Sequence, residues 1–220
     1  MTVHTPRSLA ALLCGVVLAA AAQQPSPPSP LSQNAQLLVA ARQADLPALA
    51  RLLEQGAAPN SRNRLGKTSL LIAAEKGQLP MVERLLAAKA DVQQASLEGV
   101  TPLIGAAYFG HAEVVRRLLA AGALTEPVDR MQRSAMVYAA ALGHTAVVDA
   151  MLAQGIDVDA RYANRLTALM WAAGQGQAET VKLLLARGAR TDLGDDRGFT
   201  AARMAQEAGH AALAELLGAR

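Results

Sequence analysis

The sequence predicts an all-α repeat solenoid, in which helix–turn–helix units of 33 residues stack one after another. A hydroxyl residue and a glycine return at the same place in five units, and a pair of large apolar residues does so in four of them. Chance rarely keeps several residue types in one register over five copies. The recurring residues are Thr68, Thr101, Ser134, Thr167 and Thr200, then Gly77, Gly110, Gly143, Gly176 and Gly209, and then Leu85-Leu86, Leu118-Leu119, Met151-Leu152 and Leu184-Leu185, with Leu217 closing the series.

The unit from 97 to 129 carries the pattern most fully. Its first helix begins at Thr101-Pro102-Leu103, and Gly110-His111 suits a sharp turn into a second helix. The apolar residues Val114-Val115 and Leu118-Leu119 stand at helical spacing, and Gly122 suits a helix end that needs a positive φ. Isolated helices of this length are marginal in water, so we expect each unit to depend on its neighbours for stability.

At these residues the chain resembles the ankyrin repeat family, over roughly residues 34 to 220. The shared features are the T-P-L at 101–103, the small pair Ala106-Ala107, the G-H at 110–111 and the G-A at 122–123. The resemblance implies that hairpin tips and first helices line a concave groove, which in this family binds proteins. Proline follows the threonine only at Pro102, and the family's T-P-L-H histidine is replaced in every unit, by Leu71, Ile104, Val137, Met170 and Arg203.

The predicted repeat domain consists of about six units. The first lacks the T-P-L signature and the last is short, as expected of end units that expose one face to water. Lys89 stands where other units have the glycine that ends the second helix, so we expect a looser loop there. The units are 34–63, 64–96, 97–129, 130–162, 163–195 and 196–220.

Residues 1–22 have the features of a cleaved signal peptide. Arg7 precedes an apolar run from Leu9 to Ala22 that is too short to span a bilayer, and small residues precede Gln23. An uncleaved anchor or a misassigned start is the alternative. Residues 23–33 are rich in Pro, Ser and Gln, which predicts an extended linker. The single cysteine, Cys14, lies in the predicted signal peptide, so the mature chain would contain no disulfide.

Charge and composition restrict the partners. Removal of Arg7 with the signal peptide lowers the formal charge from +3 to +2, and no dense basic run appears. Nucleic-acid binding requires a positive face that replaces counterions, so we expect none. We also expect a monomer with no membrane span after signal cleavage. The alanine-rich, lysine-poor composition suggests a Gram-negative host, which predicts a periplasmic or secreted protein.

Catalytic and metal-binding residues are not predicted. His111, His144 and His210 recur because they belong to the G-H turn, and successive copies would lie about 10 Å apart, the spacing of packed helices. Zinc ligands converge to about 2.0–2.1 Å from the metal. The repeat geometry places no serine or cysteine nucleophile beside a histidine. We therefore predict a non-enzymatic protein without a metal site or cofactor.

The aromatic side chains predict the partner-binding site. Mapping onto the family places four of the six on first helices of three adjacent units, with Tyr162 and Phe199 beside hairpin tips. Aromatic residues are enriched at binding hot spots. The alternative is that Tyr138 and Trp171 merely pack along their helices. The predicted contact residues are Tyr108, Phe109, Tyr138, Trp171 and Phe199, with Arg130 and Arg133 from a mostly basic row of hairpin-tip residues that also includes Arg64, Lys67, Arg165 and Arg197.

These observations predict a protein–protein interaction module: an exported scaffold that holds a protein partner in its groove and orients it with the basic tips. Two alternatives stay open. One is a secreted effector that acts inside a host cell. The other is a small-ligand carrier or enzyme with a pocket at Trp171 and Tyr138, which would need a convergent polar cluster that the sequence does not contain.

Overall fold

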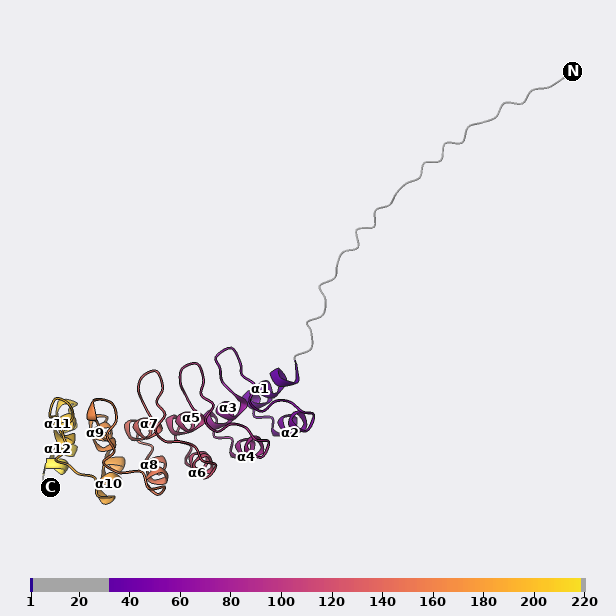
Figure 1. The fold of residues 1–220 in the computed structure, drawn as a ribbon. Helices are drawn as coiled ribbons and strands as arrows, with labels where there is room; N and C mark the ends of the chain where they lie inside the picture. Colours follow the sequence, from indigo (N-terminus) through magenta and orange to yellow (C-terminus); the bar gives the residue numbers. More distant parts are fainter. Residues whose placement is uncertain (2–31, 219–220) are drawn as a thin grey trace. The chain divides into compact units, whose positions relative to one another are not determined.

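The computed structural model describes residue 1 and residues 32–218, and this part of the chain forms twelve α-helices in six consecutive pairs (Figure 1). It contains no β-strand, only an isolated bridge between Arg62 and Thr68. The first helices of the pairs are α1 (Gln33–Gln43), α3 (Ser69–Glu75), α5 (Pro102–Tyr108), α7 (Ala135–Ala141), α9 (Ala168–Gly174) and α11 (Ala201–Glu207). The second helices are α2 (Leu46–Glu54), α4 (Leu79–Ala87), α6 (Ala112–Ala120), α8 (Thr145–Leu152), α10 (Ala178–Ala186) and α12 (Ala211–Gly218).

The predicted all-α repeat solenoid is confirmed. Each first helix packs on the first helix of the next unit, from α1 on α3 to α9 on α11. The predicted signal peptide lies outside the described residues apart from Met1, and the predicted linker lies outside them up to residue 31. The last two linker residues join the first unit, because Ser32 caps α1 and Gln33 begins it. No helix among the described residues has both the length and the apolar character that a membrane crossing requires.

The recurring hydroxyl residue is the N-cap of each first helix. Thr68 Oγ1 accepts a hydrogen bond from the Leu71 backbone N–H at 3.1 Å, and Thr101 Oγ1 accepts one from Ile104 at 3.2 Å. The cap satisfies an N–H group that has no partner within the helix. The same bond recurs in the three following units, at Ser134, Thr167 and Thr200.

The recurring glycine and histidine connect neighbouring units. Gly110 has a φ of +76°, and a Cβ on it would lie 2.6 Å from Nδ1 of His144. The His144 Nε2–H donates to the Tyr108 carbonyl oxygen at 2.9 Å, so this histidine fixes the turn of the preceding unit. Gln177 has the same role one unit later, where its amide donates to the Ala141 carbonyl oxygen at 3.1 Å.

The expectation of a looser loop at Lys89 is wrong. Lys89 adopts a φ of +65°, in the same left-handed region as Gly122 at +85° and Gly155 at +86°. The backbone therefore ends this second helix as it ends the others. A side chain at this conformation is strained, since Cβ crowds the backbone there.

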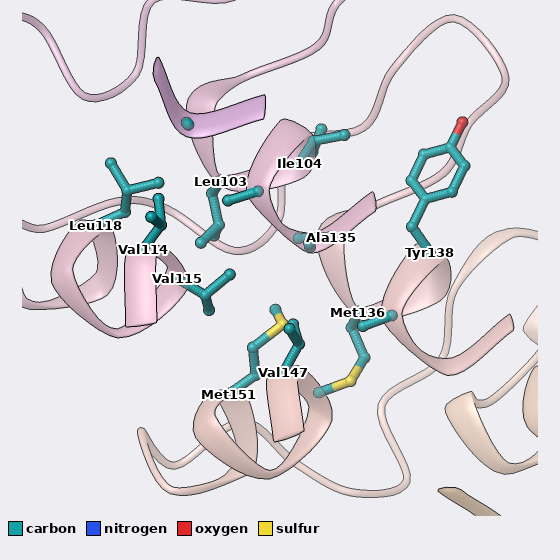
Figure 2. Close-up of a cluster of buried hydrophobic side chains, with 14 of the residues drawn as sticks. Leu103, Ile104, Val114, Val115, Leu118, Ala135, Met136, Tyr138, Val147 and Met151 are labelled. Atoms are coloured by element: carbon teal, nitrogen blue, oxygen red, sulfur yellow. The ribbon is translucent and has the colours of Figure 1, made fainter. Parts of the chain in front are cut away.

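The core lies between the two layers of helices. Val115 and Leu118 of α6 and Val147 and Met151 of α8 are fully buried and belong to one cluster with Met136 of α7 (Figure 2). These side chains come from two units, so neither unit buries its apolar surface alone. Burial of apolar area contributes roughly 25 cal/mol per Å², which makes this shared layer the main source of stability.

Replacing Leu118 with alanine should lower the free energy of unfolding by about 2–5 kcal/mol, because it leaves a cavity in the shared layer. Urea denaturation would measure the loss. Leu97→Ala is the control, since Leu97 is exposed, and it should change the stability by less than about 0.5 kcal/mol. Equal effects of the two substitutions would contradict this assignment of the core.

Glycine is required at these turns for two reasons, a positive φ and space for a neighbouring side chain, and the variants Gly110→Ala and Gly122→Ala distinguish between them. Both residues have a positive φ, but a Cβ on Gly122 meets nothing within 4 Å, whereas one on Gly110 meets the His144 ring. We expect Gly122→Ala to cost about 1 kcal/mol and Gly110→Ala clearly more, measured by thermal denaturation. Similar losses would show that the His144 contact adds nothing.

Candidate functional site

The hairpin loops project from the first helices on the side away from the second helices (Figure 1). We call the surface formed by these loops and the exposed sides of the first helices the inner face. Four of these loops are held by a polar residue that accepts two backbone hydrogen bonds, whereas the loop at 162–166 has Tyr162 at that position. Asp129 Oδ1 accepts from Met131 N–H at 2.8 Å and from Arg133 N–H at 3.1 Å. Asn63 and Asp195 make the corresponding bonds in their own loops.

Tyr108 and Phe109 are exposed on the inner face, as predicted. Tyr108 is the last residue of α5 and Phe109 is its C-cap, and the two side chains are 44% and 52% exposed. Their rings meet edge to face with centroids 4.9 Å apart, and Tyr108 makes a similar contact with Tyr138 at 5.1 Å. The aromatic cluster thus joins two neighbouring units.

Tyr138 is much less accessible than Tyr108 and Phe109. This side chain is only 7% exposed, and its hydroxyl donates to Asp129 Oδ2 at 2.5 Å. Tyr138 therefore holds the hairpin to its own first helix, and only the part of its ring that lines a hollow with Tyr108 and Phe109 is left to contact a partner. Burial, and then the hydrogen bond to Asp129, raises the Tyr138 pKa from its ordinary value to about 12.

Trp171 and Phe199 lie in a second group, toward the C-terminal end of the domain. Both side chains are half-buried and line a pocket of about 400 Å³ with Met204 of α11. Arg197 and Arg203 each place a guanidinium over the Phe199 ring, at 4.4 and 4.7 Å from its centroid. The predicted set of aromatic contacts is therefore divided into two sites.

The Trp171 indole N–H is buried and has no hydrogen-bond partner within the described residues. The Arg133 guanidinium lies over this ring at 5.4 Å and over the Tyr138 ring at 5.6 Å. Trp171 is accordingly packed on one side by Arg133 and lines the pocket on another. The structure thus shows partial packing of Trp171, and its contact with a partner stays a prediction.

The basic row is where the sequence placed it, but acidic residues on the same face neutralise much of it. Arg130 forms an ion pair with Glu98 at 3.0 Å, and Lys67 forms one with Glu75 at 2.7 Å. Arg197 pairs with the buried carboxylate of Asp195 at 2.9 Å. The inner face therefore carries alternating charges rather than a positive stripe.

Sequence reasoning missed four exposed aliphatic residues on this face. Three of them belong to hairpins, and the fourth, the C-cap of α7, occupies the same position in its unit as Phe109. The three hairpin residues could have been identified from the sequence, because a hairpin has no core that an apolar residue could fill. The four residues are Leu65, Leu97, Met131 and Leu142.

Tyr162 departs from the prediction. It does not reach the inner face but lines a cleft of about 760 Å³ among the loops that follow α6 and α8, with Leu119 and Met151. Burial raises the Tyr162 pKa to about 12. Equivalent residues in these loops bond differently. Asn60 and Asp159 each accept a hydrogen bond from the backbone of the next unit, whereas Glu126, within the described part of the chain, bonds only to its neighbour Thr125.

The histidines serve the fold. His111 Nε2 bonds to the Glu75 carbonyl oxygen at 3.1 Å, His144 bonds to a carbonyl in the same way, and His210 packs on Gly176. In the described part of the chain, no three His, Cys, Asp or Glu side chains lie close enough to hold a metal ion. The arrangement on the inner face is suited to contact, through aromatic and aliphatic surface bordered by ion pairs.

Comparison with known families agrees with this architecture. The family model described as ankyrin repeats, in three copies, matches residues 37–127, 88–162 and 136–220. These matches overlap and cover nearly all of the described repeats, so the chain belongs to the ankyrin repeat family. Comparison with curated proteins gives no match. Ankyrin repeats generally mediate protein–protein interaction and are typically not enzymes.

Tyr138→Phe should lower the free energy of unfolding by about 1–3 kcal/mol, because Asp129 Oδ2 loses its donor in a buried site. Tyr108→Phe is the control, since Tyr108 is exposed, and should have little effect. The pH dependence gives a second measurement. The folded pKa of Tyr138 is raised from near 10 to about 12, so its contribution is present below pH 10 and is lost as the pH rises toward 12.

Chemical denaturation between pH 9 and 12 would follow this loss. We expect Tyr138→Phe to flatten the decline only in part, because Tyr162 has a raised pKa in the same range. An unchanged pH profile in the variant would show that the Tyr138 hydroxyl does not contribute to stability.

Proposed function

We propose that this protein is an exported scaffold that binds a protein partner on the inner face of its ankyrin repeats. The supporting observation is the exposed apolar surface of Tyr108 and Phe109, whose rings are in contact, together with the exposed Leu142 at the equivalent position of the next unit. Large apolar side chains in contact with one another on an exposed face mark interaction sites. Folding does not require this exposure, since the core of the same units is complete without these side chains.

The charged residues of the hairpins orient the partner in this proposal. Arg130 and Glu98 are both exposed and form an ion pair, so a partner can exchange that pair for its own charges. Exposed pairs contribute little to stability, about 0–1 kcal/mol, and their exchange therefore costs little. Aromatic residues at the centre would supply affinity, and charged residues at the rim would supply register.

Export is part of the proposal and rests on the sequence of residues 1–22, with a periplasmic or secreted mature chain. The effector alternative, in which the chain acts inside a host cell, also depends on export. Fractionation of cells that produce the full chain distinguishes these destinations. A mature chain in the periplasm supports the scaffold, one in the culture medium supports the effector, and an unprocessed chain in the cytoplasm contradicts export.

A small-ligand carrier is a second candidate, supported by the pocket at Trp171 and Phe199. Its volume of about 400 Å³ lies in the range of small-molecule sites. The Trp171 indole N–H offers a donor that has no partner among the described residues. A fluorescence titration of this single tryptophan with a small-molecule library would test the candidate.

Replacing Tyr108 and Phe109 with alanine should weaken capture of the partner by at least about tenfold, since hot-spot aromatics carry much of the binding energy. The melting temperature should stay within about 3 °C of the wild-type value, because both side chains are exposed. Crosslinking and affinity capture from cell fractions, followed by quantification of the captured protein, is the measurement.

Leu124→Ala is the matched control. Leu124 is an exposed apolar residue of the same unit, but it lies in the loop after α6 and not on the inner face. Capture that survives the Tyr108/Phe109 double substitution, or that is lost equally with Leu124→Ala, would overturn the proposed binding face. A large fall in melting temperature would show instead that the two aromatic residues belong to the core.

A further inference from the structure

The inner face carries a notch beside a position of the first helix that differs between units. The fourth residue after each cap is Ile72, Tyr138, Trp171 or Met204 in the other units, but it is Gly105 in α5. The notch is a hollow of about 200 Å³ beside Gly105, between α3, α5 and α7. A Cβ on Gly105 would lie 2.9 Å from Cγ of Glu75, so the stem of this glutamate passes over the glycine.

Aromatic rings form the sides of the notch. Tyr108, Phe109 and Tyr138 line it, and successive rings are nearly perpendicular, with interplanar angles of 76° and 74°. Perpendicular rings around a hollow offer faces as well as edges. The negative face of an aromatic ring attracts a cation within about 6 Å of the ring centroid.

Two carboxylates also line the notch. Glu75 is paired with Lys67, whose Nζ lies 2.7 and 2.8 Å from its two oxygens. Asp129 is 7% exposed and accepts three hydrogen bonds, all of them from neutral donors. Among the described residues, no cation forms an ion pair with Asp129. The nearby Arg133 lies over the Tyr138 and Trp171 rings and does not line the notch.

The lining of the notch therefore carries negative charge beside an aromatic surface, because both of its charged residues, Glu75 and Asp129, are carboxylates, while Lys67 and Arg133 lie outside it. A neutral apolar side chain would fill the space but would leave that charge without compensation. An acidic side chain would be repelled by it. A lysine or arginine side chain matches both the aromatic surface and the negative charge, since its aliphatic stem packs on the rings and its charged end approaches the carboxylates.

From this complementarity we propose that the notch at Gly105 receives a lysine or arginine side chain of the protein partner. The proposal rests on the proposed function, since it assigns one anchor of the partner bound to the inner face. It also specifies the partner's chemistry: a basic residue flanked by apolar residues that cover Phe109 and Leu142.

The test is a titration of the purified full chain with Nα-acetyl-lysine N-methylamide, followed through the NMR signals of the tyrosine and phenylalanine rings. With only three tyrosines and two phenylalanines, each ring can be assigned by substitution. The expected result is a saturable shift of Tyr108 and Phe109. Nα-acetyl-norleucine N-methylamide, which has the same four-carbon stem but lacks the ammonium group, should shift them at least about tenfold more weakly.

Asp129→Asn removes the unpaired carboxylate and should weaken lysine binding by about tenfold. The fold should tolerate the change, because Asn63 makes the same two backbone bonds in its own hairpin. Asp195→Asn is the control, since Asp195 makes the same two backbone bonds in its own hairpin but does not line the notch. Tyr108→Leu, at an exposed site, provides a second variant that keeps the fold and removes one aromatic wall.

Equal shifts with the lysine and norleucine probes, or equal losses with Asp129→Asn and Asp195→Asn, would overturn the proposal. The partner captured in the earlier experiment distinguishes it from the proposed function. If capture depends on Tyr108 and Phe109 but is unchanged in Asp129→Asn, the inner face binds its partner and the notch does not receive a cation. If neither the lysine probe nor any partner depends on these residues, both ideas fail.

Discussion

No unit of this solenoid can bury its own apolar surface, and the rest of the structure depends on that constraint. The first helices from α3 onward have seven residues, which is too short for a helix to persist alone in water. Stability comes from the layer in which Leu118 and Val115 of one unit lie beside Val147 and Met151 of the next. Every other feature of the repeat serves to keep this layer in register.

The glycine and histidine of the turn illustrate how register is kept. His144 reaches back to a carbonyl at the end of α5, and Gly110 leaves the space for its ring. Gln177 shows that the role needs a donor of the right length and not an imidazole. A residue that looks like a candidate for chemistry is therefore explained by a contact between units.

The same reasoning explains which residues remain for a partner. The Asp129 carboxylate and the Tyr138 hydroxyl hold the hairpin to α7 through their hydrogen bond, which leaves the ring of Tyr138 and the negative charge of Asp129 to contact a partner. Tyr108 and Phe109 stand at the end of α5, where no further turn of helix covers them. The surface available for binding consists of the side chains that neighbouring units do not use for packing or for hydrogen bonds.

The sequence by itself determined the repeat, its helix pairs and its caps, because these depend on residues close in the chain and recur at a fixed period. The hydroxyl cap of Thr101 and the positive φ of Gly122 are local requirements of this kind. The exposure of Tyr108 and Phe109 also followed from the repeat pattern. Lys89 was the exception, since the stacked units impose on it a backbone conformation that it disfavours.

Only the tertiary structure decided how exposed the remaining candidate contact residues are. Tyr138 and Trp171 occupy the same position of the repeat, yet one is buried on Asp129 and the other borders a pocket. The hairpin before each helix accounts for part of this difference, since it supplies Asp129 to Tyr138 from nine residues away, and adjacent units account for the rest. Among the ion pairs of the basic row, Arg130–Glu98 joins neighbouring units, whereas Lys67–Glu75 and Arg197–Asp195 are local in sequence. The notch at Gly105 lies between helices of three units. A repeat pattern predicts which face a residue occupies, whereas exposure depends on what the neighbouring units place against it.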